Sequence, residues 1–202
     1  MQLFFVPGSP YARMVRIALR EAGLSARIAE TLTTLRDPAS TLLPLNPVGR
    51  VPTLLLDDGT ALTETLPILL HLDRLHDEPR LVPLDDTACM AAYGRAAGMM
   101  DGIAVWNREL RRPENERSPG VIALEATRAN RVADSCEADA VSGRLSQRFD
   151  AAWLALACAL GYCERRHQIW RWREGRPALS AWFDTAATRA SFQATIPPES
   201  GI

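Results

Sequence analysis

The pattern of secondary-structure signals changes once along the chain, and this change constrains the fold more than any other feature. Up to residue 77, short apolar runs typical of strands alternate with stretches of helical spacing. Residues 78–83 are rich in proline and charge, which is typical of a connection. Beyond residue 85 the apolar spacing is helical throughout. The sequence therefore predicts an α/β domain over 1–77, a linker over 78–85 and an all-α domain over 86–202.

The first part is predicted to form a small α/β sandwich with helices on both faces. Pro7-Gly8 ends the first strand, and Asp58-Gly59 between two apolar runs is typical of a hairpin. The predicted order is β-α-β-α-β-β-α. Its elements are a strand over 2–6, a helix over 11–22, a weak strand over 26–29, an irregular or briefly helical stretch over 37–45, the hairpin over 53–62 and a helix over 66–75.

The second part is predicted to be a helical bundle. A long helix covers about 86–110, and two more follow Ser118-Pro119 and Arg176-Pro177, where proline suits the first turn. Another begins after Asp150 and is apolar nearly all round, which is typical of a helix in the middle of a bundle.

Composition excludes several classes of function. The 202 residues carry 23 basic and 24 acidic side chains, a net charge of −1, which argues against a general nucleic-acid binder or a polybasic membrane anchor. Every basic residue is arginine, so no lysine is present for a P-loop or a Schiff base. The longest apolar stretch, 151–163, is shorter than the roughly 20 residues that span a bilayer. We expect a cytoplasmic protein with no membrane partner.

Metal and redox chemistry also lack their sequence signals. The three histidines have no metal-ligand spacing, so no metal site is expected. The four cysteines form no CxxC motif, and Cys158 and Cys163 are predicted to be buried packing thiols. Residues 165–173 mix arginine with tryptophan, which we interpret as a solvated loop with tryptophan anchors and not as a nucleic-acid site.

In order and spacing, several short motifs resemble the cytosolic glutathione S-transferase superfamily of bacterial type. The resemblance covers nearly the whole chain. It implies a thioredoxin-like α/β N-terminal domain that binds glutathione and an all-α helical-bundle C-terminal domain. The motifs are Ser9-Pro-Tyr-Ala-Arg-Met-Val-Arg16, Asn46-Pro-Val-Gly-Arg-Val-Pro-Thr-Leu54, Asp58-Gly59 through Leu62-Thr-Glu-Thr65, Gly98-Met-Met-Asp-Gly102, Ala159-Leu-Gly-Tyr162 and Arg176-Pro-Ala-Leu-Ser-Ala-Trp182.

Ser9 is the candidate catalytic residue. Its place before Pro10 predicts a helix N-cap, and a helix N-terminus also favours an anion such as a thiolate. The resemblance implies that Ser9 holds the glutathione thiol, with Tyr11 as the competing candidate and packing as its expected role. Because Ala12 stands where thiol-redox relatives have a second cysteine, dithiol exchange is excluded at this site.

The resemblance also implies the other glutathione contacts. The Val51-Pro52 bond should be cis and should turn the Val51 backbone toward the cysteinyl part of glutathione. Arg50 either reaches the glycine carboxylate or is a solvated loop residue. Glu64 should bind the γ-glutamyl ammonium.

Thr65 and Asp101 complete the candidate contacts. Thr65 should bind the γ-glutamyl carboxylate through its hydroxyl and N–H, although the usual family residue at this position is serine. The alternative for Glu64-Thr65 is a purely structural role, in which Thr63 or Thr65 caps the helix and Glu64 complements its dipole. Asp101 is a possible further contact, within the chain or across a dimer.

The resemblance implies an enzyme that conjugates the thiolate of glutathione, its co-substrate, to a small electrophilic apolar molecule. It also implies a homodimer joined mainly by the helix over 86–110 and the facing edge of the first domain. A non-catalytic relative that keeps the fold for binding or partner interaction is the alternative, and a glutathione-dependent lyase or isomerase is a third possibility.

Overall fold

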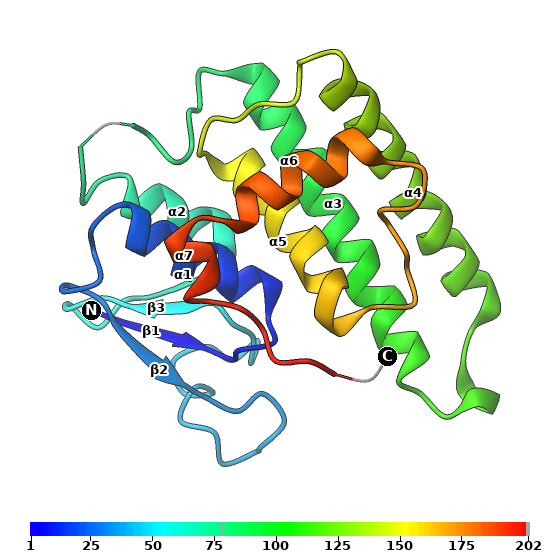
Figure 1. Cartoon of the computed structure of the whole chain (residues 1–202). Helices are drawn as coiled ribbons and strands as arrows, with labels where there is room; N and C mark the ends of the chain where they lie inside the picture. The colour runs from blue at the N-terminus through cyan, green and yellow to red at the C-terminus, as the bar shows by residue number, and fades with distance from the viewer. Residues whose placement is uncertain (78, 201–202) are drawn as a thin grey trace.

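The computed structural model describes residues 1–77 and 79–200 and has an α/β part followed by a helical part (Figure 1). The sheet order is β2-β1-β3-β4, with β1 and β2 parallel and the other pairs antiparallel. This arrangement confirms the thioredoxin-like fold. The elements of this part are β1 (Gln2–Phe5), α1 (Pro10–Glu21), β2 (Ala29–Leu32), β3 (Thr53–Leu55), β4 (Ala61–Thr63) and α2 (Thr65–Leu72).

Two predictions for the α/β part are wrong. The strand β2 begins at Ala29 and not at residue 26, because the N–H groups of Arg27 and Ile28 both donate to the carbonyl of Leu24 and hold this stretch in a turn. Over 37–45 the structure has turns and no helix, so the irregular alternative for this stretch is confirmed and the helix that the predicted order placed there is wrong. Pro38 and Pro44 fall in this stretch, and proline disfavours the helical conformation of the residue before it.

The two faces of the sheet are therefore covered differently. Successive strand residues point to opposite faces, and Leu3 packs in the main core with residues of α1 and α2. Phe4, one position later, belongs to a smaller cluster with Leu42 and Val51. Leu42 is fully buried although it lies in the turn-rich segment. A loop, drawn below the strands in Figure 1, thus replaces the helix predicted on this face.

The helical part contains the four predicted helices and two short ones that were not predicted. The side chains of Ser118 and Asp150 accept hydrogen bonds from the backbone N–H groups of Val121 and Trp153, as expected of N-caps. Most of α5 is buried, as its apolar sequence predicted. The elements are α3 (Thr87–Leu110), a 3-10 turn (Glu114–Glu116), α4 (Pro119–Val141), α5 (Ala151–Arg166), α6 (Pro177–Ala187) and α7 (Ala190–Gln193).

Arg13 lies in the junction between the two parts. Helix α1 packs against α5 and α7, so one core runs through both parts. The side chain of Arg13 is buried there, with Nε donating to Thr195 Oγ1 at 3.3 Å and a terminal nitrogen donating to the Phe192 carbonyl at 3.0 Å. Its guanidinium carbon lies 3.7 Å from the centre of the Phe192 ring. Arg13 therefore fastens α7 to α1.

The stretch between α2 and α3 is firmly packed for a connection. Leu81 and Val82 are buried, and their N–H groups donate to the Asp73 carboxylate at 2.7 and 2.9 Å. The Leu81 carbonyl accepts from Ala151 N at 2.7 Å, which ties the stretch to the start of α5. We keep the linker over 78–85 as a proposed domain boundary; residue 78 lies outside the described residues.

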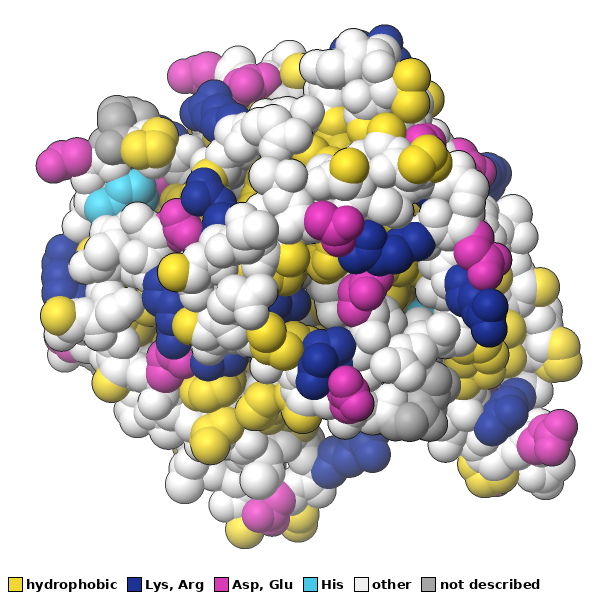
Figure 2. Space-filling view, viewed as in Figure 1, with side chains coloured by type: hydrophobic (Ala, Val, Ile, Leu, Met, Phe, Trp, Pro, Cys, Tyr) yellow, Lys and Arg dark blue, Asp and Glu magenta, His cyan; other side chains and the backbone are white. Residues whose placement is uncertain are grey.

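The surface is mixed in charge. On the face drawn in Figure 2, arginine and acidic side chains lie interspersed, without a continuous basic area. Among the helices of residues 1–77 and 79–200, none has the length and apolarity needed to cross a bilayer. Trp170 and Trp172 of the arginine-rich segment are buried, as predicted for anchors, although α5 extends to Arg166 and takes up the first part of that segment.

Candidate functional site

A cleft of about 470 Å³ lies where the start of α1, the loop before β3 and the start of α2 face α3. It brings together six of the eight candidate residues. The other two, Pro52 and Thr65, are buried next to Val51 and Glu64 and do not line it. The lining residues are Gly8, Ser9, Pro10, Tyr11, Leu35, Arg50, Val51, Glu64, Asp101, Ala104, Val105, Arg108 and Tyr162.

Ser9 caps α1, as its sequence position predicted. Its Oγ accepts a hydrogen bond from Ala12 N at 3.2 Å. A hydroxyl that accepts this bond still has its own hydrogen to donate. The first-turn N–H groups and the partial positive charge of the helix N-terminus also favour an anion at this place. Capping and donation to a thiolate are therefore compatible at Ser9.

Tyr11 has a definite partner in the cleft. Its hydroxyl donates to Asp101 Oδ1 at 2.5 Å, which joins α1 to α3. Burial, together with this hydrogen bond to a carboxylate, raises the pKa of Tyr11 well above its usual value of 10.0. A phenol has one proton to donate, and Asp101 already accepts it. Tyr11 is therefore a poorer donor to a bound sulfur than Ser9.

The loop before β3 presents backbone to the cleft. The Val51-Pro52 bond is cis, as predicted. The Arg50 carbonyl accepts from Asn46 Nδ2 at 3.0 Å and from Thr53 Oγ1 at 2.9 Å, which fixes the loop from behind. Within the described part of the chain, no backbone hydrogen bond is made by Val51. Its N–H and C=O are thus free to pair with an extended peptide.

The dipeptide at the start of α2 is strained and incompletely satisfied. Glu64 has φ of 65° and ψ of 150°, and among the described residues it is the one non-glycine with positive φ. Such a conformation costs about 1–3 kcal/mol and is concentrated at functional sites. The carboxylate of Glu64 is exposed, whereas Thr65 is buried and its Oγ1 has no hydrogen-bond partner within residues 1–77 and 79–200. A buried hydroxyl without a partner points to a ligand that completes it.

The sequence analysis missed the α3 residues beyond Asp101. Ala104, Val105 and Arg108 line the cleft and follow Asp101 by three, four and seven positions. Residues at these spacings share one face of a helix, so helical periodicity counted from Asp101 would have found them. Leu35 and Tyr162 reach the cleft from β2's following loop and from α5, and no local sequence signal marks them.

The thiols of the chain lie away from the cleft. All four cysteines are buried and free, which confirms the prediction for Cys158 and Cys163. Burial raises the pKa of Cys158 to about 12 and that of Cys163 well above the usual value of 9.0. Thiols of this kind are inert. Among the described residues, no cluster of three or more histidine, cysteine, aspartate or glutamate side chains could hold a metal ion.

Comparison with known proteins shows which family this chain resembles. Residues 3–80 match the family model of the glutathione S-transferase N-terminal domain. Over 195 residues, 95% of this chain and 96% of the relative, the sequence is 28% identical to the uncharacterized GST-like protein YibF of Escherichia coli K12.

Two solved structures of a glutathione transferase family member from Pseudomonas fluorescens Pf-5 are also similar. The one with bound glutathione has a TM-score of 0.90 at 34% identity and covers 98% of each chain. The one with bound S-(propanoic acid)-glutathione has a TM-score of 0.87 at 34% identity, covering 98% of this chain and 100% of that one. With its fold, its cleft and these relatives in agreement, the chain belongs to the glutathione S-transferase superfamily.

Proposed function

We propose that the protein is a glutathione transferase, which binds glutathione in the cleft and transfers its thiolate to an electrophilic, largely apolar co-substrate. The observation that carries the proposal is the pair at the start of α2: a strained Glu64 with an exposed carboxylate and a buried Thr65 hydroxyl without a partner. The γ-glutamyl end of glutathione has an ammonium and a carboxylate side by side. Glu64 would accept from the first, and the Thr65 hydroxyl would donate to the second.

The remaining residues of the cleft have complementary roles in this proposal. The backbone of Val51, which precedes cis-Pro52, would pair with the cysteinyl residue of glutathione. Arg50 would bind the glycine carboxylate of glutathione. The sulfur would then lie at Ser9, where the hydroxyl and the helix N-terminus stabilise a thiolate. Ala104, Val105 and the ring of Tyr162 would form an apolar wall for the co-substrate. The S-substituted glutathione held by the Pseudomonas relative supports binding of such conjugates in a cleft of this type.

The first test measures the binding of glutathione to the purified protein by calorimetry. Glu64→Ala should weaken binding by at least about 1.5 kcal/mol, the lower figure for a hydrogen bond to a charged group. An unchanged affinity would remove Glu64 from the site. Tight binding without turnover of any electrophile would favour the alternative, a glutathione-binding relative without catalysis.

The second test separates the capping role of Ser9 from its proposed catalytic role. Ser9→Ala should lower turnover at neutral pH more than it lowers glutathione affinity. It should also shift the pH–rate profile to higher pH, because the wild-type Ser9 hydroxyl stabilises the ionised thiol of glutathione. Ser118→Ala is a matched control, since Ser118 also precedes a proline and caps a helix. Each substitution should cost about 1 kcal/mol of stability through the lost cap. An unmoved pH profile in Ser9→Ala would leave the stabilisation of the thiolate to Tyr11 or to the helix N-terminus alone.

We also propose a homodimer in the cytoplasm, with α3 at the interface. Ala96, Met99 and Met100 of α3 pack inside the chain and do not contribute apolar surface to this interface. Ala91 remains exposed, and Met90 is half-buried. A monomer by light scattering would contradict the proposed assembly.

A further inference from the structure

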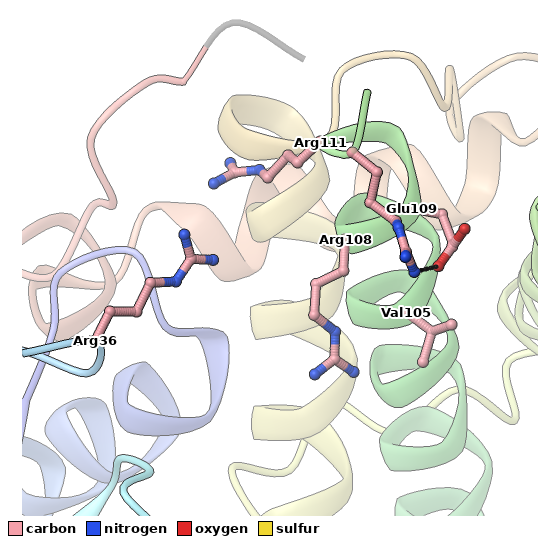
Figure 3. A pocket seen from close by; sticks show the side chains of 6 residues that line it. Arg36, Val105, Arg108, Glu109 and Arg111 are labelled. Atoms are coloured by element: carbon pink, nitrogen blue, oxygen red, sulfur yellow. Dashed lines mark hydrogen bonds and ion pairs between the residues drawn. The ribbon is translucent and has the colours of Figure 1, made fainter. Parts of the chain in front are cut away.

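A second cavity, of about 540 Å³, adjoins the cleft at the C-terminal end of α3 (Figure 3). Val105 and Arg108 line both spaces, so the two are neighbours. Arg36 extends toward it from the loop after β2, and Arg111 extends from the end of α3 toward Arg36. The lining residues are Arg36, Val105, Arg108, Glu109, Arg111 and Arg112.

The cavity has an excess of positive charge. Four arginines line it against one glutamate, and that glutamate is already engaged. Glu109 accepts from Ser118 N at 2.8 Å and from Arg112 at 3.3 Å. These contacts, the backbone hydrogen bond first, hold the pKa of Glu109 below its usual value. Glu109 and Arg112 therefore offset each other, and the other three arginines have no carboxylate of this cavity to pair with.

The partners of those three arginines are few. Within residues 1–77 and 79–200, Arg36 and Arg108 make no side-chain hydrogen bond or ion pair, and Arg111 donates to the Ser200 hydroxyl at 3.1 Å. Guanidinium groups gathered around one space repel each other unless an anion lies between them. Arginine also matches the planar geometry of a carboxylate with two parallel hydrogen bonds.

We propose that this cavity binds an anionic group of the co-substrate, so that the preferred electrophiles carry a carboxylate. The inference rests on the proposed function, and it adds the substrate class. The electrophilic carbon and its apolar body would lie against Ala104, Val105 and Tyr162 near the sulfur. The carboxylate would reach past Val105 to Arg36, Arg108 and Arg111.

A pair of isosteric electrophiles tests this proposal. Chlorodinitrobenzoate, with chlorine para to the carboxylate, and the corresponding benzamide differ in charge and little in shape. In both, the thiolate forms a carbon–sulfur bond, and chloride leaves with the electron pair of the carbon–chlorine bond. After correction for the uncatalysed reaction with glutathione, the wild-type protein should have the higher kcat/KM with the benzoate. Arg36→Gln and Arg108→Gln should each reduce the benzoate-to-benzamide ratio about tenfold, the size expected for one charge-assisted hydrogen bond.

Arg95→Gln is the matched control. Arg95 belongs to the same helix and has the same charge, but it precedes Arg108 by 13 residues, about 20 Å along α3. At physiological ionic strength this exceeds the Debye length of about 8 Å, so the control should leave the ratio unchanged. A ratio that falls equally in Arg95→Gln, or that stays fixed in Arg36→Gln, would overturn the proposal.

Calorimetry keeps this inference separate from the proposed function. The glutathione thioethers of the two compounds are stable, so their dissociation constants can be measured even if the protein catalyses neither reaction. The carboxylate thioether should bind more tightly, and Arg36→Gln should remove most of the difference. If Arg36→Gln instead weakens glutathione and both thioethers by one common factor, these arginines hold glutathione itself, and the proposed subsite is wrong.

Discussion

Two neighbouring regions along α1 differ in whether their buried polar side chains have hydrogen-bond partners. At its start, around Ser9 and Tyr11, the helix faces the cleft. The Thr65 hydroxyl, buried next to the cleft residue Glu64, has no partner within the described residues. Two residues beyond Tyr11, Arg13 enters the junction with the helical part. There its guanidinium donates to Thr195 and to the Phe192 carbonyl and stacks on the Phe192 ring.

The difference separates groups that hold the fold from groups that await a ligand. A buried polar group that is fully partnered contributes to stability, and its removal leaves those partners unsatisfied. A buried polar group without a partner destabilises the free protein and is compensated only on binding. We therefore expect substitutions in the junction to change the free energy of unfolding, and substitutions in the cleft to change affinity and catalysis.

The largest effect is expected at Arg13. Arg13→Ala should lower the free energy of unfolding by about 3 kcal/mol, because it leaves a cavity and removes the Arg13 hydrogen bonds to Thr195 Oγ1 and the Phe192 carbonyl. Arg13→Met keeps most of the volume and should cost less. Urea denaturation followed by circular dichroism measures both. A urea midpoint in Arg13→Ala equal to that of the wild type would show that the contacts of Arg13 do not stabilise the junction.

A matched pair of buried threonines tests the cleft side. Thr65→Val should weaken glutathione binding by about 1.5 kcal/mol without lowering the free energy of unfolding, because the lost hydroxyl has no partner in the free protein. In contrast, Thr53 Oγ1 donates to the Arg50 carbonyl and accepts from Asn46 Nδ2, each at 2.9 Å. Thr53→Val should therefore destabilise the fold by about 1 kcal/mol. Equal losses of stability in the two variants would show that the Thr65 hydroxyl is a structural group.

The smallest effect is expected at Tyr11, where the cleft also has a satisfied polar pair. Tyr11→Phe should cost about 1 kcal/mol of stability through the lost bond to Asp101 and leave the pH–rate profile in place. Folding raises the pKa of Tyr11 above its unfolded value of 10.0. The contribution of the neutral phenol is therefore complete below pH 10 and is lost as the pH rises further. The stability gap between wild type and Tyr11→Phe should accordingly narrow above pH 10. A shift of the pH–rate profile of Tyr11→Phe to higher pH would instead show that Tyr11 stabilises the thiolate.

Local signals explain what could be predicted about the site. Serine before proline predicted the caps at Ser9 and Ser118, because a capping side chain bonds to a backbone N–H only three residues away. The resemblance to a family supplied cis-Pro52 and the pairing of Glu64 with Thr65, which no local signal would have assigned to glutathione.

Local patterns in the sequence were enough to predict the fold class, the strands in their order and the starts of the long helices, since these depend on periodicity, caps and turns within a few residues. Which distant groups meet could be seen only in the folded chain. Tyr11 and Asp101 are 90 residues apart and share a hydrogen bond, and Arg36 faces the end of α3 across one cavity. The turn-rich segment over 37–45 likewise covers one face of the sheet, because Leu42 packs in the same cluster as Phe4. Contacts of this kind follow from the packing of whole elements, and no short stretch of sequence encodes them.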